Sequence, residues 1–411
     1  MSRKPRPAAV RPETDQPRPT PVPYRIYGDA PEPTALQQMQ SACRLPVAVA
    51  GALMPDAHQG YGLPIGGVLA TDNAVVPYAV GVDIACRMKM SVLDLPVSAL
   101  TTAQADLRRA IEKETRFGIG AEFRDRRAHD VMDADWSVSQ VTAGLKDKAW
   151  AQLGTSGSGN HFVEFGLLTL RERLGNLDAG DYLALLSHSG SRGTGARVAD
   201  HFSRLARRVH PGLPQELAHL AWLDLSTHEG QEYWAAMELM GRYAAANHEL
   251  IHRHIVRALG AGVILDVENH HNFAWRERHV LADGSERDLV VHRKGATPAG
   301  VDVLGIIPGS MAAPGYVVRG RGAEASLRSA AHGAGRRMSR TQAKKQFTWD
   351  DVRRVLAERE VTLISAGLDE VPMAYKDIDE VMAAQHDLVT VLAKFQPRLV
   401  KMAPAGERPE D

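Results

Sequence analysis

The sequence contains few cysteines, no long apolar stretch and no excess of charge of either sign. Its 411 residues include two cysteines, Cys43 and Cys86, which argues against a disulfide framework and fits a reducing compartment. No run of about 18 apolar residues occurs, so the sequence predicts no membrane span. The N-terminus has no apolar segment typical of a secretory signal. We therefore expect a cytoplasmic protein.

The charges balance over the chain but not within it. Lys plus Arg and Asp plus Glu number 49 each, which gives a formal net charge of zero. Composition therefore gives no indication of nucleic-acid binding, and any basic surface must be local. Residues 319–345 form such a strip, because eight Lys or Arg residues accompany one acid, Glu324. A solvated face and a nucleic-acid contact are both open interpretations of this strip.

Strand and helix patterns alternate along the chain, and 36 glycines supply many tight turns. This mixture predicts one large α+β domain at 24–401. A Pro- and Arg-rich segment at 1–23 is expected to be a disordered basic tail, and 402–411 a C-terminal tail. Buried strands are predicted at 47–54, 66–70, 181–188, 263–267 and 289–292. Helices are predicted at 100–113, 229–259, 350–358 and 377–392.

The most informative segment is 332–336, His-Gly-Ala-Gly-Arg. Its small residues let a backbone approach a bulky ligand closely. A neutral imidazole such as that of His332 can attack phosphorus and form a covalent intermediate, and Arg336 offers a planar cation to phosphate. The alternative is an ordinary glycine turn with a hydrogen-bonded histidine.

Five possible metal ligands each lie in a polar or glycine-rich turn near a predicted strand: Asp83, Cys86, His161, His188 and His271. One thiolate, one carboxylate and three imidazoles would suit two divalent ions, with the sulfur able to bridge them. Two ions can polarise the attacking and leaving oxygens in phosphoryl transfer. Thiolate and imidazole favour zinc or iron, whereas manganese prefers oxygen. Ordinary structural roles for these residues remain the alternative.

A second metal motif is present in the predicted helix 229–259. His248, Glu249 and His252 match H-E-x-x-H, the zinc-protease signature, in which both imidazoles share one helix face. The extended form of this motif fails, because Ile255 stands where its glycine belongs. A zinc protease is therefore a minor alternative.

Many ordered blocks together resemble the RtcB family of 3′-phosphate RNA ligases, in its shorter bacterial form. The resemblance runs from about Leu53 to Lys401. The blocks lie at 54–62, 81–86, 153–162, 188–193, 270–272, 293–296, 307–311, 332–336 and 373–382. Each block alone is weak, but all of them in this order are specific.

The resemblance implies an α+β fold with a central cleft for metal and GTP, and it implies the activity and its cofactors. It implies attack of His332 on the α-phosphorus of GTP, transfer of GMP to an RNA 3′-phosphate, and joining to an RNA 5′-hydroxyl. A 2′,3′-cyclic phosphate would first be hydrolysed to the 3′-phosphate. Two Mn²⁺ ions are expected by resemblance, with Cys86 bridging. Asp83 and His161 would complete one ion's protein shell, and His188 and His271 the other's.

The resemblance also implies a nucleotide site and a positioning group. Asp56 would position His332. The expected nucleotide-binding residues are Asn160, Glu164, Ser310, Met311, Ala334, Gly335, Tyr375 and Lys401. Glu164 would read the guanine edge, and Tyr375 would border the base. Lys294 and Arg336 are candidates for phosphate on charge alone.

Three points stay open at this stage. Arg87 stands where the family usually has glycine after the metal cysteine, and it can contact RNA phosphate or point away. The RNA could be tRNA or rRNA, with a release-factor-like or archease-like protein partner. A catalytically idle relative that binds RNA ends is the alternative from a different functional class.

Overall fold

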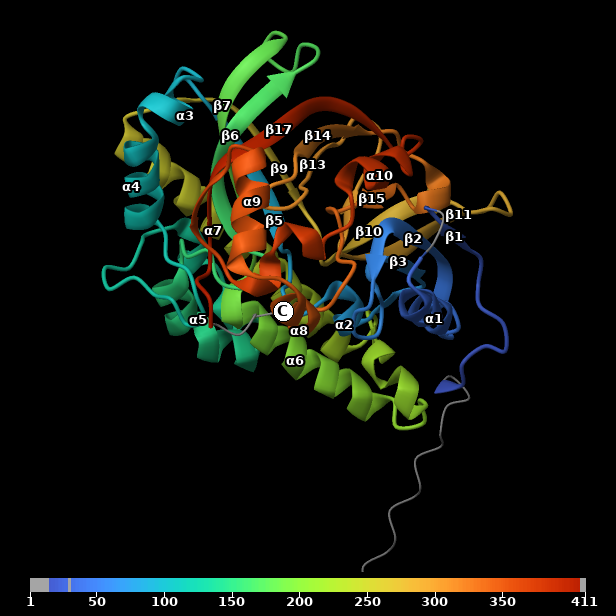
Figure 1. The fold of residues 1–411 in the computed structure, drawn as a ribbon. Coiled ribbons are helices and arrows are strands. Elements are labelled where there is room, and N and C mark those ends of the chain that lie inside the picture. Colours follow the sequence, from blue (N-terminus) through green and yellow to red (C-terminus); the bar gives the residue numbers. More distant parts are fainter. Residues whose placement is uncertain (1–14, 29–30, 407–411) are drawn as a thin grey trace, which may run out of the picture.

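The largest sheet carries most of the polar turns singled out above. A computed structural model describes residues 15–28 and 31–406. The strands of this sheet are antiparallel neighbours in the order β13 (Leu304–Ile307), β14 (Gly315–Gly320), β17 (Val389–Met402), β6 (Phe162–Leu170), β7 (Gly180–Ser189), β5 (Arg87–Leu93) and β9 (Val263–His270). A parallel strand, β16 (Thr362–Ser365), pairs with β17. Figure 1 shows β17 curving across the molecule beside β6 and β14.

A second sheet lies beside the first. Its order is β1 (Tyr24–Ile26), β2 (Ala48–His58), β3 (Ile65–Thr71), β11 (Glu286–Lys294) and β10 (Phe273–Val280). Two strand pairs complete the β-structure: β12 (Ala296–Pro298) with β15 (Ser329–Ala331), and β4 (Ala74–Val75) with β8 (Leu223–Asp224). Strand β9 ends at His270 and β10 begins at Phe273, so the chain passes between the two large sheets across only His271 and Asn272.

Helices surround the sheets. They are α1 (Pro33–Ala42), α2 (Pro77–Val80), α3 (Ala99–Thr102), α4 (Gln104–Glu114), α5 (Gln140–Gln152), α6 (Arg192–Val209), α7 (His228–Leu259), α8 (Arg340–Gln346), α9 (Trp349–Glu358) and α10 (Ile378–Ala383). Short 3₁₀ turns are η2 (Asp130–Asp133), η3 (Trp136–Val138), η4 (Gln215–Leu220), η5 (Glu324–Ser326), η6 (Leu368–Glu370) and η7 (Pro372–Ala374).

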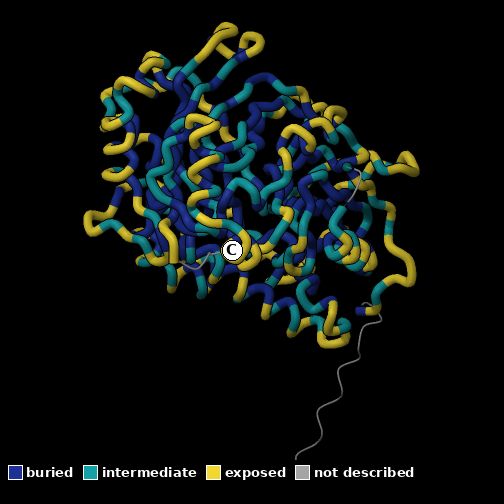
Figure 2. Tube along the Cα trace, in the orientation of Figure 1, coloured by how far each residue is buried: buried dark blue, intermediate teal, exposed yellow. Residues whose placement is uncertain are grey.

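The longest helix, α7, packs into the interior. Thr227 caps its N-terminus by accepting a hydrogen bond from the Gly230 amide, and Gly260 ends it at a φ of 64°. Its buried side chains include Tyr233 and Tyr243. Figure 2 shows buried segments concentrated in the interior of the molecule and exposed segments at its periphery. Helix α7 is buried along much of its surface. It therefore packs against both α6 and the large sheet.

The α+β class and most predicted elements are confirmed, with one clear error. The predicted strands fall within β2, β3, β7, β9 and β11, and helix 229–259 is α7. The predicted helix 377–392 is wrong beyond Ala383, because α10 ends there and β17 begins at Val389. The run 388–392, Leu-Val-Thr-Val-Leu, is rich in β-branched residues, and pairing with β14 decides its conformation.

Part of the segment that the sequence predicted as an N-terminal tail contacts the folded domain. Residues 1–14 lie outside the described part of the chain, but 15–23 contact the fold. Asp15 is buried and accepts a hydrogen bond from His210 Nδ1 at 2.7 Å, and Arg18 donates one to the Pro46 carbonyl at 2.8 Å. These polar contacts fix a segment that has few apolar residues. The C-terminal tail, expected after Lys401, begins after β17 ends at Met402, and 407–411 are outside the described residues.

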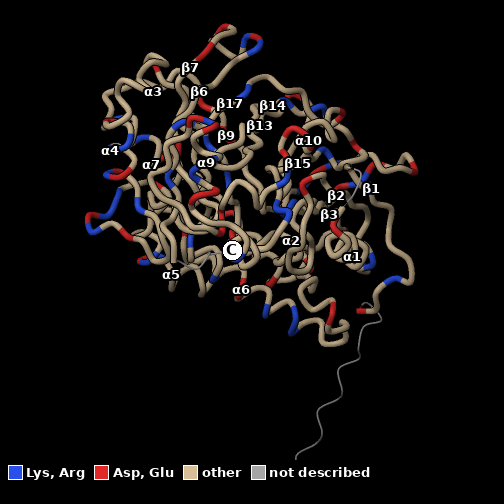
Figure 3. The backbone as a smooth tube through the Cα atoms, in the orientation of Figure 1, with Lys and Arg blue, Asp and Glu red and all other residues tan. Residues whose placement is uncertain are grey.

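Charged residues of both signs are distributed along the chain. Figure 3 shows Lys and Arg interspersed with Asp and Glu along the tube, in agreement with the balanced composition. Within residues 15–28 and 31–406, the helices include none that is both long and apolar enough to cross a bilayer.

A buried ion cluster fixes the chain just before His332. Arg293 in β11 donates to both carboxylate oxygens of Glu277 in β10, at 2.7 and 2.9 Å. The same guanidinium donates to Ser329 Oγ at 2.7 Å and to the Leu327 carbonyl at 2.9 Å. This pairing anchors β15 to the second sheet and so sets the start of the loop that carries His332.

We expect Glu277→Gln to lower the free energy of unfolding by up to about 3 kcal/mol at pH 7. Burial would raise the pKa of Glu277, but hydrogen bonds from His279 and Arg293 outweigh it and lower the pKa from 4.5 to about 2. A shift of that size corresponds to about 3 kcal/mol, which is present above pH 4.5 and is lost as pH falls toward 2.

Denaturant unfolding at pH 7 and pH 3 measures this effect. The matched control is Glu286→Gln, which removes an exposed partner of Arg278 in the same hairpin and should cost no more than about 1 kcal/mol. Equal losses of unfolding free energy in the two variants would contradict the stabilising role of the buried Glu277 carboxylate.

Candidate active site

Four neighbouring strands of the large sheet bring the predicted metal ligands together. Cys86 directly precedes β5, His161 directly precedes β6, His188 is the second-last residue of β7, and His271 directly follows β9. Because β6, β7, β5 and β9 are antiparallel neighbours, two strand starts and two strand ends meet at one edge of the sheet. The register confirms this, since His188 pairs with both Met88 and Phe162.

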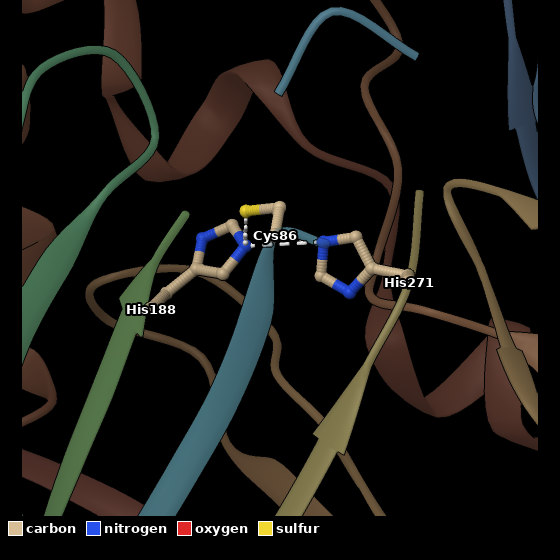
Figure 4. Close-up of side chains that lie close together, drawn as sticks. All are labelled: Cys86, His188 and His271. Carbon is tan, nitrogen blue, oxygen red and sulfur yellow. Dashed lines mark hydrogen bonds between the residues drawn. The ribbon is translucent and has the colours of Figure 1, made fainter. Parts of the chain in front are cut away.

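The ligands form two groups that share Cys86. One comprises Asp83, Cys86 and His161, and the other Cys86, His188 and His271, with the potential donor atoms of each group within 4.8 Å of one another. Cys86 Sγ lies 3.1 Å from His188 Nε2, which in turn lies 3.3 Å from His271 Nε2 (Figure 4). In the other group, His161 Nε2 lies 3.0 Å from Asp83 Oδ2 and 3.5 Å from Cys86 Sγ.

The outer nitrogen of His188 fixes the tautomer that metal binding needs. His188 Nδ1 donates to the Asn160 carbonyl at 3.1 Å. The ring therefore turns the lone pair of its Nε2 toward Cys86. Burial, with smaller contributions from neighbouring histidines, lowers the pKa of His188 to about 3, so its imidazole stays neutral. Converging lone pairs on nitrogen and sulfur fit a divalent cation, and we conclude that these buried groups can bind metal.

A tight turn sets the position of Asp83. Its Oδ1 accepts the Ser191 amide at 2.9 Å. A Cβ on Gly190 would lie 2.0 Å from Asp83 Oδ2, so only glycine allows the carboxylate to pass this turn. Burial would raise the pKa of Asp83, but the hydrogen bond and charge of His161 outweigh it and lower the pKa to about 2. The carboxylate is therefore ionised at neutral pH.

His332 faces the metal-binding groups and is oriented by Asp56. Asp56 Oδ2 lies 2.7 Å from His332 Nδ1 and 3.1 Å from the His332 amide, and accepts from both. With Nδ1 as donor, Nε2 carries the free lone pair. The His332 ring lies 4.8 Å from that of His271, centroid to centroid. A Cβ on Gly335, whose φ is 72°, would lie 2.1 Å from the Asp56 carbonyl, so this glycine brings the loop against β2.

One cavity of about 770 Å³ contains all of these groups except Asp56. Its volume suits a nucleotide. The walls include nine of the ten residues expected at a nucleotide: Asn160, Glu164, Lys294, Ser310, Met311, Ala334, Gly335, Arg336 and Tyr375. Burial raises the pKa of Glu164 well above its usual range and lowers that of Lys294 to about 7. The structure thus brings the catalytic, metal and nucleotide candidates to one place.

Lys401, which the resemblance implies is a nucleotide-binding residue, does not line the cavity. Its ammonium lies 5.4 Å from the centre of the Phe117 ring, and it is not among the cavity-lining residues. Alternation along β17 explains this, because the neighbouring Met402 lines the cavity instead. A nucleotide contact from Lys401 requires its long side chain to turn toward the cavity.

Arg336 is not a free cation in this structure. Its guanidinium donates to Glu370 Oε2 at 2.9 Å and to the Asp369 carbonyl at 2.7 Å. Buried Glu370 also accepts from Arg340 Nε at 2.8 Å and from the Tyr375 hydroxyl. Charge alone therefore does not make Arg336 a phosphate ligand, because the nearby carboxylate offsets it.

Sequence reasoning missed two residues that organise this region. Glu370 joins Arg336, Arg340 and Tyr375, and only its place just before the block 373–382 pointed to it. Lys376 Nζ donates to the carbonyls on both sides of Asp56, Pro55 at 3.0 Å and Ala57 at 2.7 Å. Lys376 belongs to that block, but its sequence context gives no sign of a partner in β2.

Arg87 points away from the cavity. Its guanidinium pairs with Glu268 in β9 and donates to the Gly241 carbonyl in α7 at 3.1 Å. The side chain therefore links β5 to β9 and α7 behind the metal ligands. The sequence left open whether Arg87 contacts RNA phosphate or points away, and the structure shows that it points away.

The H-E-x-x-H histidines do not form a metal site within the described residues. His248 and His252 have hydrogen bonds at both ring nitrogens, to Ser187, Ser189 and Ser91. Glu249 lies on the exposed side of the helix, beside Arg253 and His129. Without converging free lone pairs, this motif has no place for zinc.

Comparisons with known proteins agree with this geometry. A family model described as "tRNA-splicing ligase RtcB" matches residues 38–402. The "RNA-splicing ligase RtcB" of Escherichia coli strain K12 is 36% identical, over 90% of this chain and 95% of that protein. The "tRNA-splicing ligase RtcB" of Thermococcus kodakarensis is 31% identical over 92% and 94%. The "RNA-splicing ligase RtcB" of Mycobacterium tuberculosis is 31% identical over 89% and 99%.

Proposed function

This chain belongs to the RtcB family, and from that membership we propose that it is an RNA ligase that joins a 3′-phosphate end to a 5′-hydroxyl end with GTP. The observation that carries the proposal is a single cavity containing His332 and two metal-binding groups joined by Cys86. The RNA is a broken or spliced tRNA or rRNA, and a 2′,3′-cyclic phosphate end is hydrolysed before joining.

The first chemical step would take place at His332. Its Nε2 attacks the α-phosphorus of GTP, a phosphorus–nitrogen bond forms, and pyrophosphate leaves. Asp56 holds the proton on Nδ1 and stabilises the positive charge that develops on the ring. Two divalent ions, which we propose to be Mn²⁺, would be held by the two groups sharing Cys86 and would neutralise phosphate charge.

The remaining steps return His332 to its starting state. An oxygen of the RNA 3′-phosphate attacks the phosphorus of the histidine–GMP adduct, and Nε2 leaves. The RNA 5′-hydroxyl then attacks the activated 3′-phosphate, a 3′,5′-phosphodiester forms, and GMP leaves. GMP is thus the leaving group that makes joining of a phosphate monoester possible.

Glu164 and Tyr375 would select the guanine base. Glu164 is a buried carboxyl on β6, and no other charged group contributes to the rise in its pKa. An acceptor there matches the N–H edge of guanine, which adenine lacks. Tyr375 lines the same cavity and would border the base.

Incubation with α-labelled GTP and Mn²⁺ tests the proposal. We expect an acid-labile labelled protein with the wild type and none with His332→Ala, whose Mn²⁺ content should stay normal because His332 is in neither metal group. Ligation is then measured with RNA bearing a 3′-phosphate and a 5′-hydroxyl, with 3′-hydroxyl and 5′-phosphate ends as the control.

The outcome separates the ligase from its alternative. Binding of RNA ends without an adduct or ligation would overturn the proposal and favour a catalytically idle RNA-end-binding protein.

A further inference from the structure

Lys376 connects the loop of His332 to the strand that carries Asp56. Its backbone amide donates to the Gly335 carbonyl at 2.9 Å, within the loop that begins at His332. Its side chain crosses to β2, where Nζ donates to the two carbonyls that flank Asp56. One residue therefore holds the chain on both sides of the hydrogen bond between Asp56 and His332.

Strand β2 leaves its sheet at the position of Asp56. In the described structure no pairing with β1 or β3 involves residues 54–57, and the register with β3 shifts between Leu53 and His58. Pro55 favours this break, because proline has no N–H to donate to a neighbouring strand. Residues 54–57 thus form a bulge, whose carbonyls need hydrogen-bond partners outside these two ladders.

Side chains supply partners for three successive carbonyls of the bulge. Lys376 Nζ lies 3.0 Å from the Pro55 carbonyl and 2.7 Å from the Ala57 carbonyl. His58 Nδ1 lies 3.0 Å from the Asp56 carbonyl and donates to it, because a carbonyl only accepts. Two of these three bonds depend on Lys376, so its ammonium restricts the peptides on both sides of Asp56.

The carboxylate of Asp56 is fully buried, and its two oxygens differ. Oδ2 accepts from Nδ1 and the amide of His332, whereas Oδ1 has no hydrogen-bond partner among the described residues. Burial lowers the pKa of Lys376, and the charges of Asp56 and Glu32 oppose this lowering. The ammonium is thus close enough to offset the charge of a carboxylate that is costly to bury alone.

Lys376 can affect the chemistry only through Asp56. It is not among the residues that line the cavity, and it belongs to neither metal group. Asp56 Oδ2 has to stay within hydrogen-bond distance of His332 Nδ1, now 2.7 Å, and movement of the bulge would lengthen this bond. A displacement of about 1 Å at a catalytic group can slow a reaction by about a hundredfold.

We propose that Lys376 is a positioning residue, which clamps the bulge of β2 so that Asp56 faces His332 and formation of the histidine–GMP adduct is fast. The inference rests on the proposed function for the step that the clamp serves. A lysine that only stabilised the fold would not act specifically on the hydrogen bond between Asp56 and His332.

Lys376→Met tests the clamp, because methionine fills similar space without a charge or a donor. In single turnovers with α-labelled GTP, we expect adduct formation at saturating GTP to slow by about a hundredfold. The GTP concentration for half-maximal rate should change by less than about threefold, since Lys376 is not in the cavity wall. Mn²⁺ content should stay normal.

Lys376→Arg should restore the rate to within about tenfold of the wild type, because a guanidinium keeps the charge and can donate to both carbonyls. The matched control is Lys394→Met, which removes another half-buried lysine. Lys394 lies 5.8 Å from the centre of the Tyr316 ring, outside the cavity. Its loss should alter the rate by less than about threefold.

A double-mutant cycle shows whether Lys376 acts through Asp56. In an Asp56→Asn background the hydrogen bond that the clamp protects is already impaired, so Lys376→Met should slow the reaction further by less than about threefold. Slowing by the same factor in both backgrounds would overturn the proposal. Should Lys376→Met not fold, Lys376→Gln takes its place, because its amide keeps donors for the bulge but lacks the charge and reach of lysine.

The Nδ1–H group of His332 provides a readout that needs no GTP. In nuclear magnetic resonance spectra with ¹⁵N-labelled histidine and diamagnetic Zn²⁺ as the metal, it is identified as the signal that His332→Ala removes. We expect its proton to resonate downfield in the wild type and in Lys376→Arg, and to move upfield or disappear in Lys376→Met, because the bond to Asp56 weakens. An unchanged signal in Lys376→Met would contradict the clamp.

These two readouts separate the clamp from the ligase mechanism. A wild type that forms no adduct, but whose His332 signal changes in Lys376→Met, would refute the ligase mechanism alone. An adduct-forming wild type with an unchanged signal and equal slowing in both backgrounds would refute the clamp alone.

Discussion

Replacing Asp56 with asparagine is expected to slow formation of the histidine–GMP adduct by roughly three to four orders of magnitude, as loss of the carboxylate that orients a catalytic histidine does elsewhere. Asp56 Oδ2 accepts from both His332 Nδ1 and the His332 amide. An amide nitrogen placed there would face two donors. The other arrangement would put the amide nitrogen at Oδ1, a buried position with no hydrogen-bond partner in the described structure. Either arrangement also removes the negative charge that stabilises the ring after attack.

Single-turnover measurement with α-labelled GTP checks this expectation. Mn²⁺ content should be unchanged, because Asp56 belongs to neither metal group. The matched control is Glu32→Gln, which removes a carboxylate from the rim of the same cavity and should alter the rate less than tenfold. A rate in Asp56→Asn within tenfold of the wild type would show that His332 does not depend on this carboxylate.

The metal site illustrates what a sequence can predict about a distant constellation. Each ligand lies at or near the end of a strand, and this much is visible from the pattern around Cys86, His161 and His188. That the turns meet depends on strand order, because β5 pairs in the sheet with β7 and with β9, neither of which is next to it in the chain. From the sequence alone, only the resemblance of the ordered blocks to a known family indicated that these turns meet.

The sequence did not reveal the side-chain partners that tertiary packing supplies. Charge alone makes Arg336 a candidate for phosphate, but buried Glu370 lies 2.9 Å from its guanidinium. Lys401 was expected at the nucleotide, but strand alternation turns it toward Phe117. His248 and His252 matched a zinc motif, but serines on β5 and β7 occupy their ring nitrogens. Spacing along a helix or strand determines which side chains share a face. The residues that pack against that face determine whether those side chains are free to bind a ligand.

Cys86→Ala should remove both metal ions, whereas His161→Ala or His188→Ala should each remove one. The reason is geometric, since Cys86 belongs to both ligand groups and each histidine belongs to one. Adduct formation in Cys86→Ala should fall by roughly a thousandfold or more. Metal ions supply several kcal/mol of charge stabilisation at a reacting phosphate, and each 1.4 kcal/mol is about tenfold in rate.

Metal content per chain, measured by mass spectrometry after removal of free ions, distinguishes these variants. The structural control is Cys43→Ala, because Cys43 is buried among apolar side chains and belongs to neither metal group. Retention of one ion by Cys86→Ala would show that the thiolate serves a single group. Loss of both ions in His161→Ala would show instead that the two groups fill cooperatively, since Cys86 cannot then hold the second ion with His188 and His271 alone.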